Sequence, residues 1–422
     1  MITRRQFAST ALATTAVTSA QVKQPTILLR TAWQTRNIGD VCFTPSMISA
    51  LERFVPGAKV IAWMSNSNEG IDAMVRRAHP NVEILHANLG SEGKEMDPKL
   101  REAFSRASLF LFNSGPLFNY GLHESYSWDR TMTNANILLY AKDAGVPYGI
   151  YGQSFDRFAW PSELLFRRLL GDAAFVYTRD TNSLRYLKSL NIKPPVLDFA
   201  PDIAFHFRLR DDAPAQAFLQ AKGLEKDKFL VTIVHYALLD RPGVRERGEE
   251  YAEKHRQVLA KWIRETGLPV LVVAEDDREV ELGKKILIDP QPEEIRKKMI
   301  LRETFWRPDE ALSTYLQSRA LFSMEPHSCI FAMANGIPSL HCHDWAFGRK
   351  AEMFLDLGLG DWVFHLADAS ADQMSAALLA VHHDPLKAKS KLQEAMKTVD
   401  AKMSAAFKAL ARSTRKRQLA HG

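Results

Sequence analysis

Arg179 is the residue of this sequence best suited to hold an anion. It follows a predicted strand in Thr178-Arg179-Asp180, where a helix begins. Its guanidinium can hold a carboxylate or a phosphate through two parallel hydrogen bonds, and a surface ion pair is the alternative role. Ligands of open parallel sheets bind at the carboxyl ends of the strands, so the residues just after each strand are the candidates for a site.

The segment 323–328, Ser-Met-Glu-Pro-His-Ser, lies between a predicted strand and a predicted helix. Pro326 fits a first helical turn, and the free N–H groups of a helix N-terminus attract anions. His327 can transfer a proton near neutral pH, although a buried histidine that only packs or caps is the alternative. The candidates in this segment are Ser323, Glu325 and His327.

Other predicted strands are followed by loops with glycine, amide or carboxylate groups. In the first loop Gly39 allows close approach of a ligand, and Asn37 and Asp40 either contact that ligand or form the turn and cap the next helix. We expect that helix to open near Pro45. Later loops add these candidates: Ser114, Gly115, Gln153 and Asp202.

We expect neither a metal nor a cofactor. His341 and His343 would point the same way from a strand, and Asp344 follows them, but no further ligand has zinc-like spacing. The cysteines show no CxxC pattern and are predicted to be small core residues. They are Cys42, Cys329 and Cys342.

Strands and helices alternate along the chain, which predicts parallel sheets covered on both faces. The alternation breaks at 206–226, where charged residues, Pro214 and Gly223 coincide. The predicted fold class is α/β, with two Rossmann-like doubly wound domains facing across a cleft in a GT-B-like arrangement. The expected strands are 26–33, 60–63, 82–85, 109–112, 147–151, 174–178, 196–199, 229–234, 269–274, 320–324 and 337–342, and a helix is expected at 292–299. The expected organisation is an N-terminal domain at 24–205, a connection at 206–226, a C-terminal domain at 227–365 and a helical segment at 366–422.

The first twenty residues predict export. Residues 3–7, Thr-Arg-Arg-Gln-Phe, have the twin-arginine pattern, a weakly apolar stretch follows, and residues 18–20 offer a cleavage site. An ordinary disordered start is the alternative. We therefore expect a periplasmic protein, with no stable membrane insertion once residues 1–20 are removed, because no run of ~18 apolar residues occurs elsewhere.

The charge balance gives no sign of a nucleic-acid partner. The 422 residues include 55 Lys and Arg against 49 Asp and Glu, a formal net charge of +6. The densest basic stretch is the C-terminal tail around 412–417, which is typical of a solvated helix end.

The order of these motifs resembles the polysaccharide pyruvyl transferase family. Residues 37–40 match its early Asn-x-Gly-Asp loop, and 179–183 match its Arg-Asp-x-x-Ser helix start. Reduced forms of its glycine-containing loops occur at 113–116 and 152–153. Further matches are Pro201-Asp202, Ser323, His327, Gly336, Pro338, Lys350 and the segment 356–359. Glu325 stands where the family usually has an arginine.

The resemblance implies transfer of pyruvate from phosphoenolpyruvate to two sugar hydroxyls as a ketal, in exopolysaccharide biosynthesis. Such a reaction needs anion contacts, an acid for the enol carbon and a base for a hydroxyl. We expect Arg179 and Lys350 to contact the anion and His327 to act as the acid or a phosphate contact. Asp40 or Asp202 would activate or orient the hydroxyls.

Two other functions fit the same residues. A GT-B glycosyltransferase would use a sugar nucleotide, with Glu325 contacting the donor ribose. A non-catalytic protein on this fold would only bind glycans. In each case the partners are small molecules and glycans.

Overall fold

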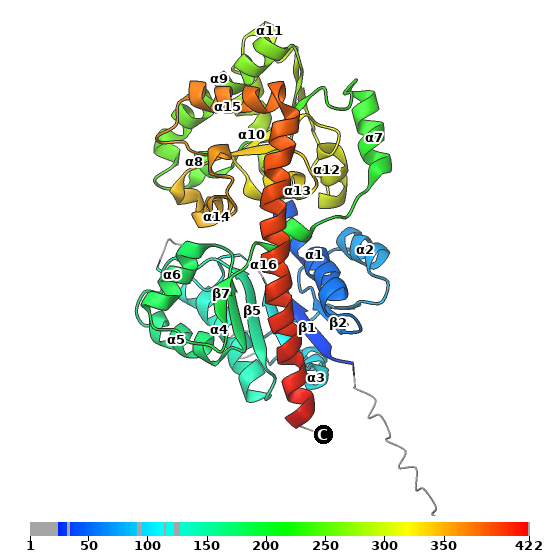
Figure 1. Ribbon diagram of the computed structural model, residues 1–422, viewed down its shortest axis with the longest axis vertical. Coiled ribbons are helices and arrows are strands. Elements are labelled where there is room, and N and C mark those ends of the chain that lie inside the picture. Colours follow the sequence, from blue (N-terminus) through cyan, green and yellow to red (C-terminus); the bar gives the residue numbers. More distant parts are fainter. Residues whose placement is uncertain (1–23, 32–33, 91–94, 114, 122–126, 421–422) are drawn as a thin grey trace, which may run out of the picture.

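The computed structural model describes residues 24–420 apart from 32–33, 91–94, 114 and 122–126. Two parallel sheets, each covered by helices, form two lobes (Figure 1). The strand order is β3-β2-β1-β4-β5-β6-β7 in the first sheet and β10-β9-β8-β11-β12-β13 in the second. The predicted doubly wound α/β class is therefore confirmed.

The first lobe holds the seven-stranded sheet. Its strands are apolar on both faces because helices cover both sides; all five residues of β4 are buried. The strands are β1 (Thr26–Arg30), β2 (Lys59–Trp63), β3 (Glu83–Leu85), β4 (Leu109–Asn113), β5 (Tyr148–Gln153), β6 (Phe175–Thr178) and β7 (Leu197–Phe199). The helices are α1 (Ile38–Phe54), α2 (Glu69–Ala78), α3 (Pro98–Arg106), α4 (Trp128–Asp143), α5 (Ser162–Asp172) and α6 (Thr181–Ser189).

The second lobe holds the six-stranded sheet. Its strands are β8 (Leu230–Ile233), β9 (Val270–Val272), β10 (Met299–Leu301), β11 (Ala320–Ser323), β12 (Ser339–His343) and β13 (Val363–His365). Its helices are α7 (Asp212–Ala221), α8 (Ala237–Asp240), α9 (Gly248–Thr266), α10 (Glu279–Gly283), α11 (Glu293–Arg296), α12 (Pro308–Tyr315), α13 (Pro326–Ala334), α14 (Glu352–Asp356) and α15 (Ala371–His383). A short 3-10 helix, Ile203–His206, precedes this lobe.

Three local predictions were wrong. Helix α1 begins at Ile38, well before Pro45, because the side chain of Asn37 caps it by accepting hydrogen bonds from the N–H groups of residues 39 and 40. The helix predicted at 292–299 ends at Arg296, and the edge strand β10 follows. Strands β10 and β13 have three residues each, too few for a periodic pattern to identify.

Helix α16 (Pro385–Ala420) runs along both lobes (Figure 1). Its buried residues recur at helical spacing and form one apolar stripe. Phe407 stacks on Phe54 of α1, with ring centroids 5.2 Å apart, and lies 5.5 Å from Tyr151 of β5. The last helix of the chain therefore stabilises the first lobe. Among the residues described, no helix is both long and apolar enough to cross a membrane.

Candidate functional site

The carboxyl ends of the two sheets meet beside the first turn of α1. The Ile38 N–H donates to the carbonyl of Glu275, which follows β9, at 2.8 Å. Gly39 packs directly on His327 of α13, where an added Cβ would lie 2.2 Å from the ring Nδ1. Two motifs far apart in the sequence therefore form one site, and only glycine fits at this contact.

The N-terminus of α13 is occupied by a buried carboxylate of the protein itself. Glu275 Oε2 accepts the Ser328 N–H at 2.7 Å, and Oε1 lies 2.9 Å from His327 Nδ1. Burial raises the pKa of Glu275, but the hydrogen bond and charge of His327 outweigh it and lower that pKa to about 2. Within the described chain, His327 Nε2 is buried and has no hydrogen-bond partner.

Two hydrogen bonds fix the Arg179 guanidinium, and its third nitrogen has no partner in the described part of the chain. Its Nε donates to Ser154 Oγ at 2.8 Å, and Nη1 donates to Asp202 Oδ2 at 2.9 Å. The other oxygen of Asp202 accepts the Ala204 N–H at 2.9 Å. Asp202 therefore orients the arginine, while Nη2 is buried with no partner among the described residues and lies beside Gly115.

The last residues of β4 and β5 each carry a buried side-chain donor. Asn113 Nδ2, at the end of β4, and Gln153 Nε2, at the end of β5, are buried and find no acceptor in the described part of the chain. The Gln153 amide is oriented by the Leu117 N–H, which donates to its Oε1 at 3.2 Å. A buried donor without a partner costs about 1–3 kcal/mol of stability. An anion with several acceptor oxygens would satisfy the row of donors formed by Asn113, Gln153 and Arg179.

Asp40 lies between the anion contacts of the two lobes. It is half-buried, and the Gln34 amide donates to it. Burial raises the pKa of Asp40, and the charges of Lys350 and His327 partly oppose that rise. Asp40 is therefore better prepared to accept a proton than an exposed carboxylate is.

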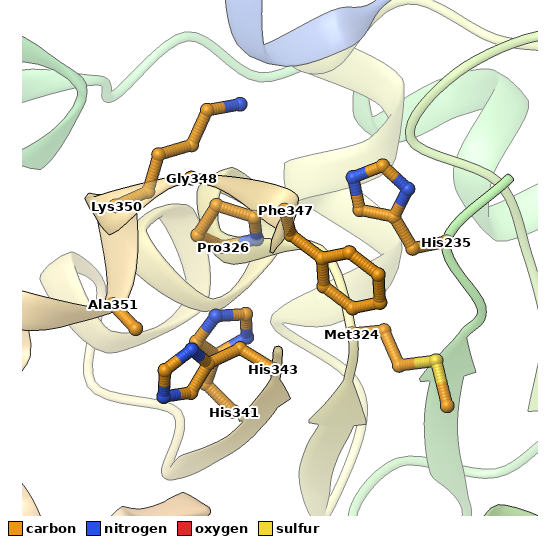
Figure 2. Close-up of a pocket in the computed structure, with 9 residues that line it drawn as sticks. All are labelled: His235, Met324, Pro326, His341, His343, Phe347, Gly348, Lys350 and Ala351. Atoms are coloured by element: carbon orange, nitrogen blue, oxygen red, sulfur yellow. The ribbon is translucent and has the colours of Figure 1, made fainter. Parts of the chain in front are cut away.

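A small pocket in the second lobe contains Lys350 and a group of imidazoles (Figure 2). The rings of His341 and His343 stack with centroids 5.7 Å apart. Burial lowers the pKa of His341 to about 4 and that of His343 to about 2, so both are neutral at pH 7. Lys350 therefore brings the positive charge to a pocket of neutral rings.

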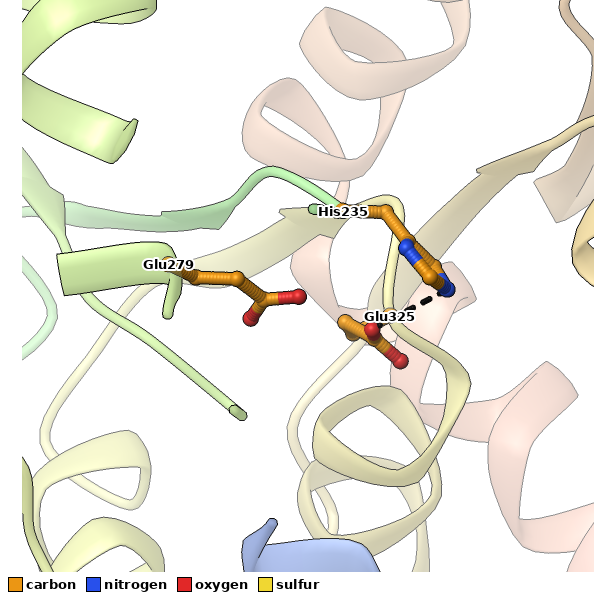
Figure 3. Close-up of side chains that lie close together, drawn as sticks. All are labelled: His235, Glu279 and Glu325. Atoms are coloured by element: carbon orange, nitrogen blue, oxygen red, sulfur yellow. Dashed lines mark ion pairs between the residues drawn. The ribbon is translucent and has the colours of Figure 1, made fainter. Parts of the chain in front are cut away.

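Glu325 lies in a second cluster with Glu279 and His235 (Figure 3). His235 Nε2 is 3.2 Å from Glu325 Oε1, and its Nδ1 accepts the Ala237 N–H at 3.0 Å. Burial raises the pKa of Glu325 well above its ordinary value and raises that of Glu279 to about 8. A proton on this pair leaves Glu325 a neutral acid.

The ligand atoms of these three groups lie within 4.8 Å of one another, close enough to surround a metal ion. A metal would need the lone pair of His235 Nε2. A neutral imidazole has one nitrogen lone pair, and Nδ1 already uses it to accept a backbone N–H. The cluster therefore suits a shared proton better than a metal.

The sequence-derived candidates gather around this junction, apart from Ser114, which lies outside the described residues. Ser323 shapes the turn before α13, since its Oγ accepts the Glu325 N–H at 2.9 Å. The sequence reasoning missed Asn113, Glu275, Glu279 and His235. Asn113 ends β4, and His235 and Glu275 follow β8 and β9 closely, so position at the carboxyl edge was the available signal.

The sequence profile of a family described as polysaccharide pyruvyl transferase matches residues 37–342. No curated protein sequence matches the chain significantly. Similar solved structures include Anabaena Alr3699/HepE in complex with UDP, with 9% identity, a TM-score of 0.55 and coverage of 93% of this chain and 100% of that one. The S. aureus MnaA–UDP structure has 12% identity, a TM-score of 0.54 and coverage of 88% and 91%.

The structure of UDP-GlcNAc 2-epimerase from Methanocaldococcus jannaschii is similar to the same degree, with 11% identity, a TM-score of 0.54 and coverage of 84% of this chain and 92% of that chain. These likenesses extend over both lobes. They confirm that the lobes have the GT-B-like arrangement.

Proposed function

Because this chain belongs to the polysaccharide pyruvyl transferase family, we propose that it transfers pyruvate from phosphoenolpyruvate to two hydroxyls of a sugar, forming a ketal. The observation that carries the proposal is the row of buried donors on Asn113, Gln153 and Arg179, which have no partner among the described residues. The carboxylate and phosphate of phosphoenolpyruvate have only acceptor oxygens at neutral pH, apart from the second phosphate proton. They complement this row and the nearby Lys350.

The proposed reaction balances without a cofactor. C3 of the enol gains a proton, C2 is attacked by one sugar hydroxyl and then by the second, and the bond from C2 to phosphate breaks. Of the two hydroxyl protons, one restores the acid that protonated C3, and the other leaves with the phosphate. The products are the pyruvyl ketal and inorganic phosphate.

The described residues suit these steps. His327 Nε2 is unpaired at the site, and Glu275 orients the ring through Nδ1, so His327 is the proposed acid. Asp40, whose pKa burial raises, is the proposed base for a sugar hydroxyl. Asp202 acts by positioning Arg179, because both of its oxygens are already engaged.

Glu325 and Glu279 share a proton, and Glu325 does not repel an anionic donor when that proton is on its own carboxyl group. A carboxylate in place of the family's arginine would repel a phosphate. The neutral acid removes that repulsion, although it offers no positive charge in return. In this chain the positive charges then come from Arg179 and Lys350.

Transfer from a sugar nucleotide is the second candidate, because similar structures were solved with UDP and UDP-glucose. A diphosphate is expected at a helix N-terminus at the carboxyl edge of a sheet. In this chain the N-terminus of α13 is occupied by the Glu275 carboxylate, with Glu279 and Glu325 nearby. That arrangement favours a donor held by the first lobe.

Thermal unfolding of the chain from Gln21 onward, in phosphate-free buffer, tests the proposal. Phosphoenolpyruvate should raise the unfolding temperature of the wild type and of Arg185→Lys, an exposed arginine of α6, but not of Arg179→Lys. Phosphate release that depends on an added glycan would then establish turnover. A shift with UDP-glucose and none with phosphoenolpyruvate would support the second candidate. A shift with sugars alone would indicate a glycan-binding protein.

A further inference from the structure

A second cavity, of about 290 Å³, lies between the lobes near the start of α1. Ile38 and Val41 line it, whereas Gly39 packs on His327. Successive residues of a helix are 100° apart, so positions 38 and 41 share a face opposite to positions 39 and 40. The cavity is therefore separate from the anion contacts but borders the same helical turn.

The lining combines an apolar floor with a polar rim. From the first lobe the cavity is lined by Thr35, Ile38, Val41, Asn68, Gly70 and Ile71. The second lobe contributes the segment 305–308, Phe-Trp-Arg-Pro, and Glu310. Aromatic and aliphatic groups beside hydroxyl, amide and charged groups suit a ligand that is itself amphipathic.

The charges that line this cavity are already paired. Arg307 lies 3.1 Å from Asp211 and 3.5 Å from Asp309. Glu310 lies 2.7 Å from Arg302. With neither an unpaired cation nor an unpaired anion among its described lining residues, the cavity favours a neutral ligand over a phosphate or a nucleotide.

We propose that this cavity binds a neutral sugar unit of the acceptor glycan, next to the unit that reacts. The proposal rests on the proposed function and extends it. The volume is near the lower limit for ligand pockets, which suits one or two sugar rings. Gln34 contacts Asp40, and its neighbour Thr35 lines the cavity. A glycan that crosses this loop would therefore reach both Asp40 and the cavity.

Gly70 allows the cavity to be filled with little change elsewhere. It is an exposed helical residue of α2, and a Cβ built on it meets only an ordinary contact, 3.5 Å from Asn68 Oδ1. Gly70→Phe should place a ring in the cavity. Gly171→Phe makes the same change at a helical glycine of α5, which has nothing within 4 Å and lies outside the lining, and is the matched control.

The test is calorimetric titration with glucose, galactose and mannose and with di- and tetrasaccharides built from them. For the wild type and Gly171→Phe, at least one oligosaccharide should bind about tenfold more tightly than its monosaccharide. Gly70→Phe should abolish that advantage while the unfolding shift with phosphoenolpyruvate is unchanged. Phe305→Ala, which truncates a half-buried ring, should weaken the binding of the same oligosaccharide.

Oligosaccharide affinity that is equal in Gly70→Phe and the wild type would overturn the proposal, and so would the absence of oligosaccharide binding by the wild type. The donor titration distinguishes the two hypotheses. If the wild type binds the oligosaccharide but shows no unfolding shift with phosphoenolpyruvate, pyruvyl transfer is refuted and the sugar site in the cavity stands.

Discussion

Glu325 and Glu279 show how burial changes what a residue type contributes. Both carboxyl groups are buried, and burial raises the pKa of each, that of Glu279 to about 8 against an ordinary 4.5. Between those values the folded protein holds a proton that the unfolded chain releases. This contribution to stability is therefore fully present at or below pH 4.5 and is lost as the pH rises toward 8.

Glu325→Gln should reduce this dependence on pH. The glutamine amide imitates the protonated acid and needs no proton, so the variant should lose less stability than the wild type between pH 6 and pH 8.5. One proton accounts for at most about 1.4 kcal/mol per pH unit. The measurement is the unfolding temperature across this range. Glu265→Gln, at an exposed acid, should keep the wild-type dependence, and an unchanged dependence in Glu325→Gln would contradict the shared proton.

Glu275 acts on the proposed reaction through another residue. Its carboxylate holds both His327 and the Ser328 N–H in the first turn of α13, so Glu275→Gln should misplace the imidazole. We expect kcat to fall about 10²-fold while the KM for phosphoenolpyruvate changes little. Steady-state kinetics of phosphate release check this, with Glu281→Gln, at an exposed acid of α10, as the control. A rise in KM with kcat unchanged would instead indicate a role in donor binding.

At the scale of elements, the contact between α1 and α13 requires a residue without a side chain. Gly39→Ala must displace His327, because the new Cβ would lie 2.2 Å from Nδ1. We expect a loss of about 1–3 kcal/mol in stability and a large loss of activity. Gly171→Ala, at a helical glycine with nothing within 4 Å, should be neutral or stabilising. Unfolding temperature and turnover, measured for both variants, decide between these outcomes.

Helix α16 is predicted to stabilise the first lobe through Phe407. This ring packs on Phe54 and Tyr151, so Phe407→Ala should cost about 3–5 kcal/mol. Lys408→Ala changes the next residue, which is exposed, and should cost less than 1 kcal/mol. Thermal unfolding of the two variants tests the contact. Equal stability would show that α16 contributes little to the first lobe.

At the scale of the whole molecule, we propose that the protein is exported by its first residues, which lie outside the described part of the chain. A twin-arginine signal depends on both arginines, so changing Arg4 and Arg5 together to lysine should retain the protein in the cytoplasm. Cell fractionation with an antibody to the folded protein measures this. Changing Lys23 to arginine, beyond the predicted signal, should leave the distribution unchanged, and periplasmic accumulation of the double variant would refute the signal.

The sequence alone determined the class of fold, because buried parallel strands are continuous apolar runs and the helices between them keep their own period. It also indicated most of the residues of the candidate site, since side chains just after parallel strands gather at one edge of a sheet. It did not identify β10 or β13, whose three residues carry no period.

Only the tertiary structure decided which groups pair and which remain free. Asp202 accepts a hydrogen bond from Arg179, and Glu275 accepts one from the first turn of α13. Glu325 and Glu279 hold protons because both carboxyl groups are buried. None of these pairings is local in the sequence. Hydrogen bonding and pKa depend on distances and burial that chain positions do not specify, so the chemistry of the site followed from the packing of the two lobes.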